Sequence, residues 1–185
     1  LADKYFCNFS VFQSVPDSWA IDQVFPVLPI QRLNEEPKRE ATLEDITCDS
    51  DGRLDLFIGT NRNNTPTLKV HKLEKGEPYQ LGIFLTGSYQ EILGDLHNLF
   101  GDTNTFHVSI QDDGSLKYEQ IIEGENVTDV LDYVQFKADE LAGRVSGFLV
   151  NYVETGHISQ EEADKFLSLY KDGLNGYTYL LKSNT

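Results

Sequence analysis

Residues 42–58, TLEDITCDSDGRLDLFI, contain two strand-like runs separated by a turn-forming segment. From Thr42 to Cys48 the side chains alternate between two sets, as they do along a strand with one buried face. The run stops at the turn-rich residues 49–52, and β-forming residues resume from Arg53 to Ile58. Aspartate, serine and glycine favour tight turns, so we expect an antiparallel hairpin here.

Most of residues 1–122 shows the same strand-and-turn character. Ile21–Ile30 is apolar and rich in β-formers, but its prolines at 26 and 29 limit it to an edge or irregular strand. We also expect a polar loop at Asn61–Pro66, a buried strand at Tyr79–Thr86, and a hairpin that pairs Phe106–Gln111 with Ser115–Ile122 across Asp112–Gly114.

Helical spacing of apolar residues occurs in two places. Within the β region, the stripe from Tyr89 to Phe100 predicts one helix, with a capping box at Ser88 and Glu91 and a stop at Gly101. After Gly124 the period is helical throughout. We expect helices at Val127–Val134, at Ala138–Tyr152 and after a capping box formed by Ser159 and Glu162.

These patterns together predict an α+β fold. Residues 1–124 are expected to form a mainly antiparallel, β-barrel-like domain with one inserted helix, and residues 125–185 a carboxy-terminal helical extension. The 39% hydrophobic fraction of the 185 residues is enough for a globular core.

The charge balance restricts the partners of the protein. Fifteen Lys and Arg against thirty Asp and Glu give a net charge of −15, which disfavours nucleic acid. No apolar run is long enough to cross a bilayer, so we expect no membrane partner and a cytoplasmic location. Since the chain begins at Leu1 and contains no methionine, we expect it to be a processed chain or part of a longer one.

The strand-end segment Cys48-Asp49-Ser50-Asp51-Gly52 is the first candidate site. A carboxylate there can hold a cationic group by charge-assisted hydrogen bonds, and the thiol can act as acid, base or nucleophile. Ordinary turn chemistry, with Cys48 as a small core residue, explains the same residues. A calcium loop is a third reading, but the later glycine and glutamate of such loops are missing. Cys7 and Cys48 lack the spacing of a metal site, and no metal is expected.

Two further segments carry polar groups that could take part in binding. Gly87-Ser88-Tyr89 lies at an expected helix start, where free N–H groups and a tyrosine hydroxyl suit a phosphate. Alternatively, Tyr89 only begins the apolar stripe. His97 could bind a metal or move a proton, although a histidine at a helix end usually satisfies a carbonyl.

The lysines and glycines exclude some chemistry. A lysine that forms a Schiff base must be desolvated in a pocket. Five lysines lie in polar, loop-like or exposed-strand segments, so we do not expect them to be buried: Lys38, Lys69, Lys72, Lys75 and Lys117. No phosphate-binding glycine-rich fingerprint of the Walker or Rossmann type is present.

Several long motifs resemble the biosynthetic arginine decarboxylases, and their order along the chain also agrees. They are Tyr5–Ser10, Phe12–Ser14, Pro16–Asp17, Trp19–Gln23, Phe25–Pro26, Asp45–Gly52, Tyr89–Gly94, His97–Thr103 and Gly173–Leu180. The resemblance covers nearly the whole chain.

The resemblance implies a pyridoxal-phosphate enzyme of the alanine-racemase and ornithine-decarboxylase group. Such an enzyme converts L-arginine to agmatine and carbon dioxide in polyamine biosynthesis. Its upstream barrel domain would carry the Schiff-base lysine and most cofactor contacts, so the isolated chain is expected to be inactive. The family also implies a homo-oligomer with active sites across subunits, and leaves room for magnesium. The competing hypothesis is a non-catalytic oligomerisation module.

Site residues follow from the resemblance by position. Cys48 would reach the active site of a neighbouring subunit and help to protonate the decarboxylated carbanion. Asp49 would bind the guanidinium of the substrate, with Asp51 in support. Asn8 falls near a substrate-binding aspartate of ornithine decarboxylases, and the change to asparagine weakens that correspondence.

The cofactor contact follows in the same way. Gly87 and Tyr89 match a Gly-x-Tyr motif whose tyrosine hydrogen-bonds the cofactor phosphate. Relatives read Gly-Ala-Tyr where this chain has Gly-Ser-Tyr, and the small Ser88 should not disturb that role.

Overall fold

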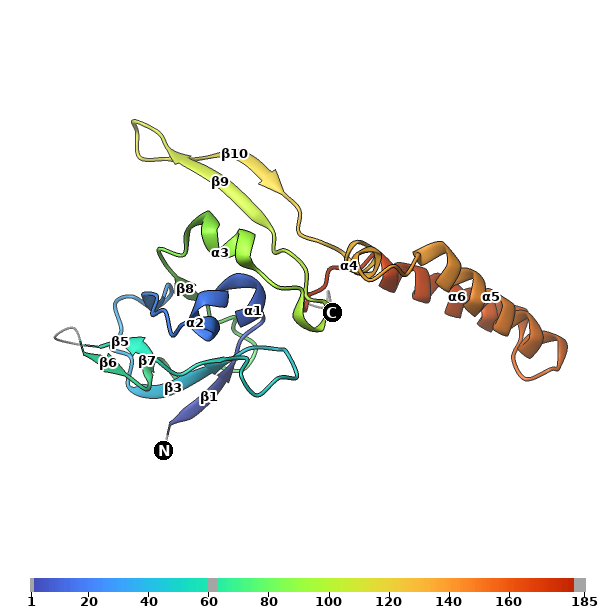
Figure 1. Cartoon of the computed structure of the whole chain (residues 1–185), viewed down its shortest axis with the longest axis horizontal. Helices are drawn as coiled ribbons and strands as arrows, with labels where there is room; N and C mark the ends of the chain where they lie inside the picture. The colour runs from blue at the N-terminus through green and yellow to red at the C-terminus, as the bar shows by residue number, and fades with distance from the viewer. Residues whose placement is uncertain (1, 60–62, 182–185) are drawn as a thin grey trace. The chain divides into compact units, whose positions relative to one another are not determined.

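A computed structural model describes residues 2–59 and 63–181. The chain folds as two compact units, Leu1–Asn98 and Leu99–Thr185, and each is considered by itself. Figure 1 shows that the first unit contains a sheet and short helices, whereas the second contains a hairpin and longer helices.

The main sheet of the first unit has β3 (Arg39–Glu44) at its centre. It pairs in parallel with β1 (Asp3–Phe6) and antiparallel with β4 (Arg53–Leu54) and β7 (Leu68–Val70). The pairing of Leu43 with Leu54 confirms the predicted hairpin. β3 ends at Glu44, earlier than expected, so that residues 45–52 form a loop between the two strands.

The remaining strands of the first unit form two small sheets. β2 (Val27–Pro29) pairs with β8 (Leu81–Ile83), so both predicted strands exist but are only three residues long. β5 (Phe57–Ile58) pairs with β6 (Asn64–Thr65). Part of the loop expected at Asn61–Pro66 is therefore a strand, while residues 61 and 62 lie outside the described residues.

Two short helices were missed by the sequence interpretation. They are α1 (Val11–Ser14), capped by the Ser10 side chain, and α2 (Pro16–Ala20), which has a proline at its start. Val11 and Val15 pack into the core of the unit, whose buried members are Tyr5, Val11, Val15, Phe25, Ala41, Leu43, Leu54, Phe57, Leu68 and Val70. In Figure 1, α1 and α2 lie between the main sheet and α3 (Gly87–Leu93).

The helix predicted from Tyr89 to Phe100 is wrong in its extent. α3 stops at Gly94, and a short 3-10 turn, η2 (His97–Leu99), follows. The Asp95 N–H donates to the Phe12 carbonyl at 3.0 Å, and a side chain at position 94 would meet Gln13. This close approach to α1 overrides the apolar spacing. Thr86 occupies the N-cap position, so the capping box predicted at Ser88 is also wrong.

The second unit agrees closely with the sequence interpretation. β9 (Thr105–Ile110) and β10 (Leu116–Ile122) form the predicted hairpin, with an irregular register between Tyr118 and Gln120. Three helices follow, α4 (Val127–Tyr133), α5 (Ala138–Glu154) and α6 (Gln160–Leu174). The capping box of Ser159 and Glu162 is present at the start of α6.

The α+β class is confirmed, whereas the barrel-like description is wrong. Within residues 2–59 and 63–181 the strands form one four-stranded and three two-stranded sheets, and none closes into a barrel. The predicted domain boundary after residue 124 stays a prediction; the two compact units divide after Asn98, with the β9–β10 hairpin in the second. No helix in the described part of the chain is long and apolar enough to span a membrane.

Candidate substrate-contacting and cofactor-contacting site

The loop between β3 and β4 is built on Asp45, whose side chain is only 3% exposed. Its Oδ2 accepts the Val11 N–H at 2.9 Å, and its Oδ1 accepts the Thr47 N–H at 2.9 Å and the Thr47 hydroxyl at 2.6 Å. The Asp45 N–H donates to the Gly52 carbonyl at 2.8 Å. A buried carboxylate with three donors ties this loop to α1, because leaving it unsatisfied would be costly.

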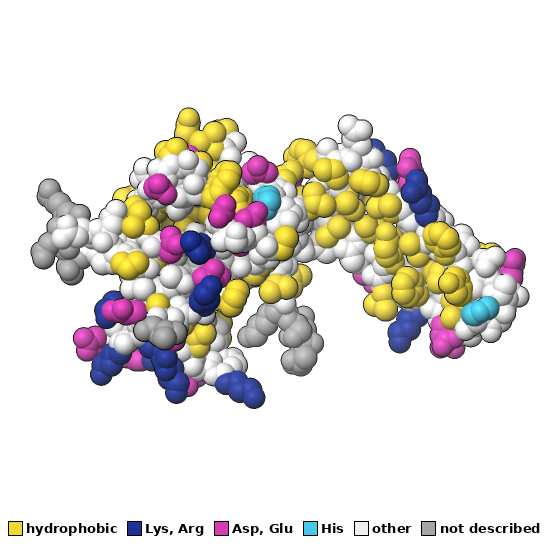
Figure 2. Space-filling view, turned by 60° about the horizontal axis from the view of Figure 1, so that its bottom comes forward, with side chains coloured by type: hydrophobic (Ala, Val, Ile, Leu, Met, Phe, Trp, Pro, Cys, Tyr) yellow, Lys and Arg dark blue, Asp and Glu magenta, His cyan; other side chains and the backbone are white. Residues whose placement is uncertain are grey.

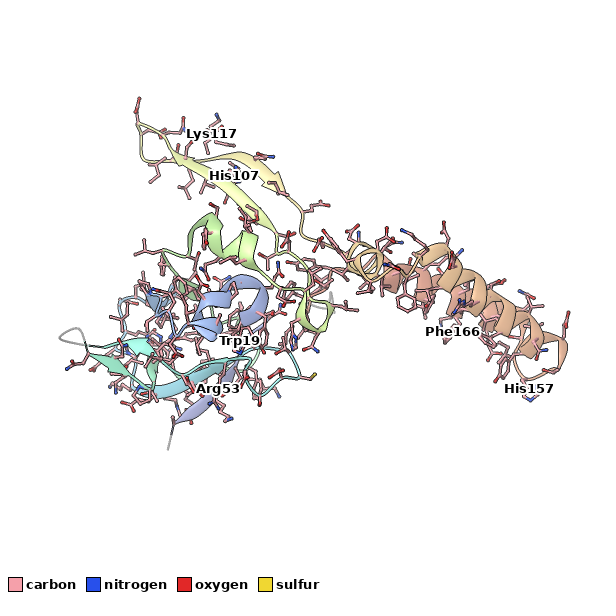
Figure 3. All side chains as sticks on the ribbon, in the orientation of Figure 1. Trp19, Arg53, His107, Lys117, His157 and Phe166 are labelled. Atoms are coloured by element: carbon pink, nitrogen blue, oxygen red, sulfur yellow. The ribbon has the colours of Figure 1, made fainter. Side chains whose placement is uncertain are left out.

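The Asp49 side chain takes part in the turn itself. Its Oδ1 accepts the Asp51 N–H at 2.9 Å, and its carbonyl accepts the Gly52 N–H at 3.2 Å. The turn-forming alternative is therefore realised, but the Asp49 side chain remains 38% exposed and can still meet a ligand. Asp51 is exposed. Arg53, labelled in Figure 3, follows the turn and pairs its Nε with Asp55 Oδ2 at 2.9 Å.

Cys48 is an exposed free thiol, which excludes the alternative of a small core residue. Asn98 contacts it twice: Asn98 Oδ1 accepts the Cys48 N–H at 3.4 Å, and Asn98 Nδ2 donates to Cys48 Sγ at 3.4 Å. The Asn98 backbone is left-handed, with φ 57° and ψ 22°. Asparagine tolerates this conformation better than most residues.

His97 approaches the same loop at Asp49. Its Nε2 is 3.5 Å from Asp49 Oδ2, and its ring lies 4.4 Å from the Phe12 ring, centroid to centroid. The Phe12 ring also contacts the ring of Trp19, which Figure 3 labels, at a centroid distance of 5.2 Å. Cys48, Asp49, His97 and Asn98 therefore form one cluster. The described residues contain no group of three or more His, Cys, Asp or Glu that could hold a metal ion.

Gly87 and Tyr89 lie in the first turn of α3, outside the cluster at Cys48. Tyr89 is 67% exposed, so its hydroxyl is available to a ligand. Gly87 has φ +65° and open space where a β-carbon would stand. The first turn of α3 has no acidic residue and no side-chain cap, and these features fit a phosphate.

Asn8 lies in the segment between β1 and α1. It is exposed and lines a cleft of about 780 Å³ that Cys7, Tyr79 and Leu81 also line. The segment that carries Asn8 adjoins the Cys48 loop, because the Ile46 N–H donates to the Phe9 carbonyl at 3.2 Å. Burial raises the pKa of the neighbouring Cys7 thiol to about 11. Of the two cysteines, Cys48 is the exposed one.

Sequence reasoning missed three residues on which this cluster depends. Asp45 looked like one more strand residue, Gly52 like a generic turn glycine, and Asn98 like part of a motif without a role. A sequence signal existed only for Gly52, since glycine commonly ends such turns. Every lysine in the described part of the chain is exposed, so none lies in a desolvated pocket.

Comparisons with known proteins identify relatives of this chain. Residues 127–180 match the family model of the arginine decarboxylase C-terminal helical extension. The chain is 61% identical over 180 residues to the biosynthetic arginine decarboxylase of Bacteroides thetaiotaomicron, and 57% identical over 180 residues to that of Phocaeicola vulgatus. Each alignment covers 97% of this chain and 28% of the relative.

A solved structure supports the same assignment. The biosynthetic arginine decarboxylase SpeA from Campylobacter jejuni superposes with a TM-score of 0.83 and 35% identity, covering 97% of this chain and 29% of that one. The chain thus spans less than a third of the length of these relatives. It belongs to the biosynthetic arginine decarboxylase family and corresponds to the carboxy-terminal part of those enzymes.

Proposed function

We propose that this chain completes the active site of an arginine decarboxylase, which converts L-arginine to agmatine and carbon dioxide. The product would enter polyamine biosynthesis, including that of spermidine, and the reaction would consume arginine in the cytoplasm. The observation that carries the proposal is the loop at Cys48 and Asp49, which presents an exposed thiol beside a half-exposed carboxylate. The similarity to arginine decarboxylases over 97% of the chain supports it.

Asp49 is the proposed partner of the substrate guanidinium. A guanidinium is planar and permanently charged, so a carboxylate can hold it by charge-assisted hydrogen bonds. One Asp49 oxygen accepts the Asp51 N–H, which restrains the carboxylate and leaves the second oxygen for a ligand. Asp51 is exposed on the same turn and adds a second negative charge in support.

Cys48 is the proposed proton donor. After carbon dioxide leaves, the α-carbon holds an electron pair and must gain a proton to give agmatine. A thiol within hydrogen-bond reach can supply that proton and regain it from solvent. Since Cys48 is exposed on its own unit, it is free to enter the active site of a neighbouring subunit in a homo-oligomer. Asn8, on the adjoining segment, is a weaker candidate for substrate contact.

Tyr89 and Gly87 are the proposed contacts to the phosphate of pyridoxal phosphate. The exposed Tyr89 hydroxyl and the uncapped N–H groups of α3 are suitable donors. The electron sink for decarboxylation is supplied by pyridoxal phosphate when it is bound. The lysine that attaches it would lie in the upstream barrel domain, since the described lysines are exposed. Magnesium has no candidate ligand cluster in the described residues, so no metal role is proposed for this chain.

The proposal is tested with the complete enzyme that contains this chain. We expect agmatine formation by the complete enzyme and none by the 185 residues alone. In the complete enzyme, Cys48→Ala should lower kcat at least about a hundredfold, as loss of a proton-transfer group does. Asp49→Asn should mainly raise KM for arginine. Near-normal kinetics in both variants would overturn the proposed roles.

A second role in assembly is favoured by the apolar surface of the helical extension. Figure 2 shows apolar side chains gathered along α5 and α6. Phe148 and Tyr152 on α5 are 69% and 50% exposed, and Phe166 and Leu169 on α6 are 56% and 61% exposed. Exposed aromatic and aliphatic groups of this kind mark interaction surfaces. Phe148→Glu should reduce the oligomer mass in size-exclusion chromatography with light scattering if these helices hold subunits together.

A further inference from the structure

The side chains of His97 and Asn98 face the turn that carries Cys48 and Asp49. Asn98 holds Cys48 by two contacts of 3.4 Å, one to the backbone N–H and one to the sulfur. Its left-handed backbone, followed by Leu99 at φ 61°, is uncommon for residues other than glycine. Such a conformation persists only where surrounding contacts maintain it, and it is often found at functional positions.

The His97 imidazole presents a second unusual feature. Its Nε2 is buried and makes no hydrogen bond within the described part of the chain. The nearby Asp49 Oδ2 lies 3.5 Å from it. The ring itself is held against Phe12. A buried polar atom without a partner is rare in native proteins and calls for a functional explanation.

We propose that His97 and Asn98 are positioning residues for the reaction. His97 orients the Asp49 carboxylate for the guanidinium of the substrate, and Asn98 orients the Cys48 thiol for proton transfer. The inference rests on the proposed function of Cys48 and Asp49. The Asp51 N–H holds Asp49 Oδ1, so His97 acts on the second oxygen, Oδ2. Positioning of this kind matters because misplacement of a reacting group by about 1 Å can cost a hundredfold in rate.

The role of His97 is tested by two substitutions that separate its nitrogen from its ring. His97→Phe keeps the aromatic contact with Phe12 and removes Nε2, whereas His97→Gln keeps an amide nitrogen donor and removes the ring. In the complete enzyme we expect His97→Phe to raise KM for arginine about tenfold, the effect of one lost interaction with a charged group, with kcat nearly unchanged. His97→Gln should keep KM within about threefold of the parent value. Equal effects in both variants, or a larger effect of Gln, would assign His97 to packing and overturn its proposed role.

The role of Asn98 is tested by Asn98→Asp, which keeps the Oδ1 acceptor for the Cys48 N–H and tolerates the left-handed backbone. The substitution removes the donor to sulfur and places negative charge beside it, which disfavours the thiolate. We expect Cys48 alkylation by iodoacetamide at pH 8 to slow about fivefold and kcat to fall about tenfold, with KM unchanged. Peptide mass spectrometry reads Cys48 separately, with the partly buried Cys7 as an internal reference. An unchanged alkylation rate and kcat would overturn the role of Asn98.

Three controls keep the outcomes distinct. Asn34→Asp makes the same charge change at an exposed position of the first unit and should leave alkylation and kinetics unchanged. Thermal unfolding of each variant separates loss of fold from loss of positioning. If Cys48→Ala and Asp49→Asn are harmless, the proposed function itself fails. If those two variants are impaired while the His97 and Asn98 variants are not, only the positioning inference fails.

Discussion

The carboxylate of Asp45 occupies the space that a β-carbon on Gly52 would need. The two residues lie at opposite ends of the loop that carries Cys48 and Asp49, and the Asp45 N–H bonds the Gly52 carbonyl at 2.8 Å. The backbone of Gly52 is not left-handed, so backbone conformation does not require a glycine here. The requirement comes from the close approach of the Asp45 side chain. Asp45, which anchors the loop, and Gly52, which closes it, therefore pack directly against each other.

Gly52→Ala should accordingly destabilise the first unit by about 1–3 kcal/mol, because the added methyl overpacks a filled site. The measurement is the urea midpoint of unfolding. Gly76→Ala is an unsuitable control because of its φ of +83°, whereas Gly143→Ala places its methyl in open space on α5 and should be neutral or stabilising. Equal midpoints for Gly52→Ala and the parent would contradict the close packing of Asp45 against Gly52.

Tyr79→Phe should cost about 1–3 kcal/mol of stability. The Tyr79 hydroxyl accepts the His71 backbone N–H at 2.9 Å and lies within hydrogen-bond distance of His71 Nδ1, at 2.7 Å. Removing the hydroxyl leaves two polar groups of the buried His71 unsatisfied. Chemical denaturation measures the loss, and Tyr118→Phe on the exposed β10 strand is the control that should change little.

Cys7 predicts a pH dependence at the alkaline end. Burial raises the pKa of its thiol from 9.0 to about 11, so between these values the unfolded chain loses a proton that the folded chain keeps. The stability that this group contributes is present below pH 9 and is lost as the pH rises toward 11. In Cys7→Ala the loss of stability over this interval should be smaller by about 2 kcal/mol. This is less than the free energy that corresponds to the whole pKa shift, because Cys7 is partly exposed. Parallel stability curves for the two proteins would disprove the assignment.

Ser159→Ala should lower the stability of α6 by about 1 kcal/mol. The Ser159 hydroxyl accepts the Glu162 N–H at 3.2 Å, while Glu162 accepts the Ser159 N–H at 2.8 Å. The bonds that the Ser159 N–H and the Ser159 hydroxyl donate to the Glu162 carboxylate lower the pKa of that carboxyl. Thermal melting followed by circular dichroism measures the effect. Ser168→Ala, an exposed position within the same helix, should not lower the melting temperature.

Tyr89→Phe in the complete enzyme should weaken cofactor binding about tenfold, as expected for loss of one hydrogen bond to a phosphate. Titration of the cofactor by fluorescence measures this binding apart from turnover. Tyr118→Phe again serves as the control, since Tyr118 is exposed to a similar extent at 61%. Unchanged cofactor affinity would remove Tyr89 from the proposed phosphate contact.

Local patterns predicted the second unit well and the first unit only in part. The capping box at Ser159 and the Asp112–Gly114 turn act within a few residues, so their outcome is visible in sequence. The break at Gly94 depends on contact with α1, and no local signal records it. For the same reason the approach of Asn98 to Cys48, fifty residues apart, could not be predicted. The family resemblance named Cys48 and Asp49, but not the residues that hold them.

The anchoring of the loop through Asp45 has a consequence for altering substrate preference. Its bonds to Val11 and Thr47 make the geometry of the turn dependent on α1 and on the core beneath it. A single exchange at Asp49 would change the charge offered to a ligand but not the direction in which it is offered. Redesign for a basic amino acid with a shorter or longer side chain would require the transfer of residues 45–52 together with residues 97 and 98.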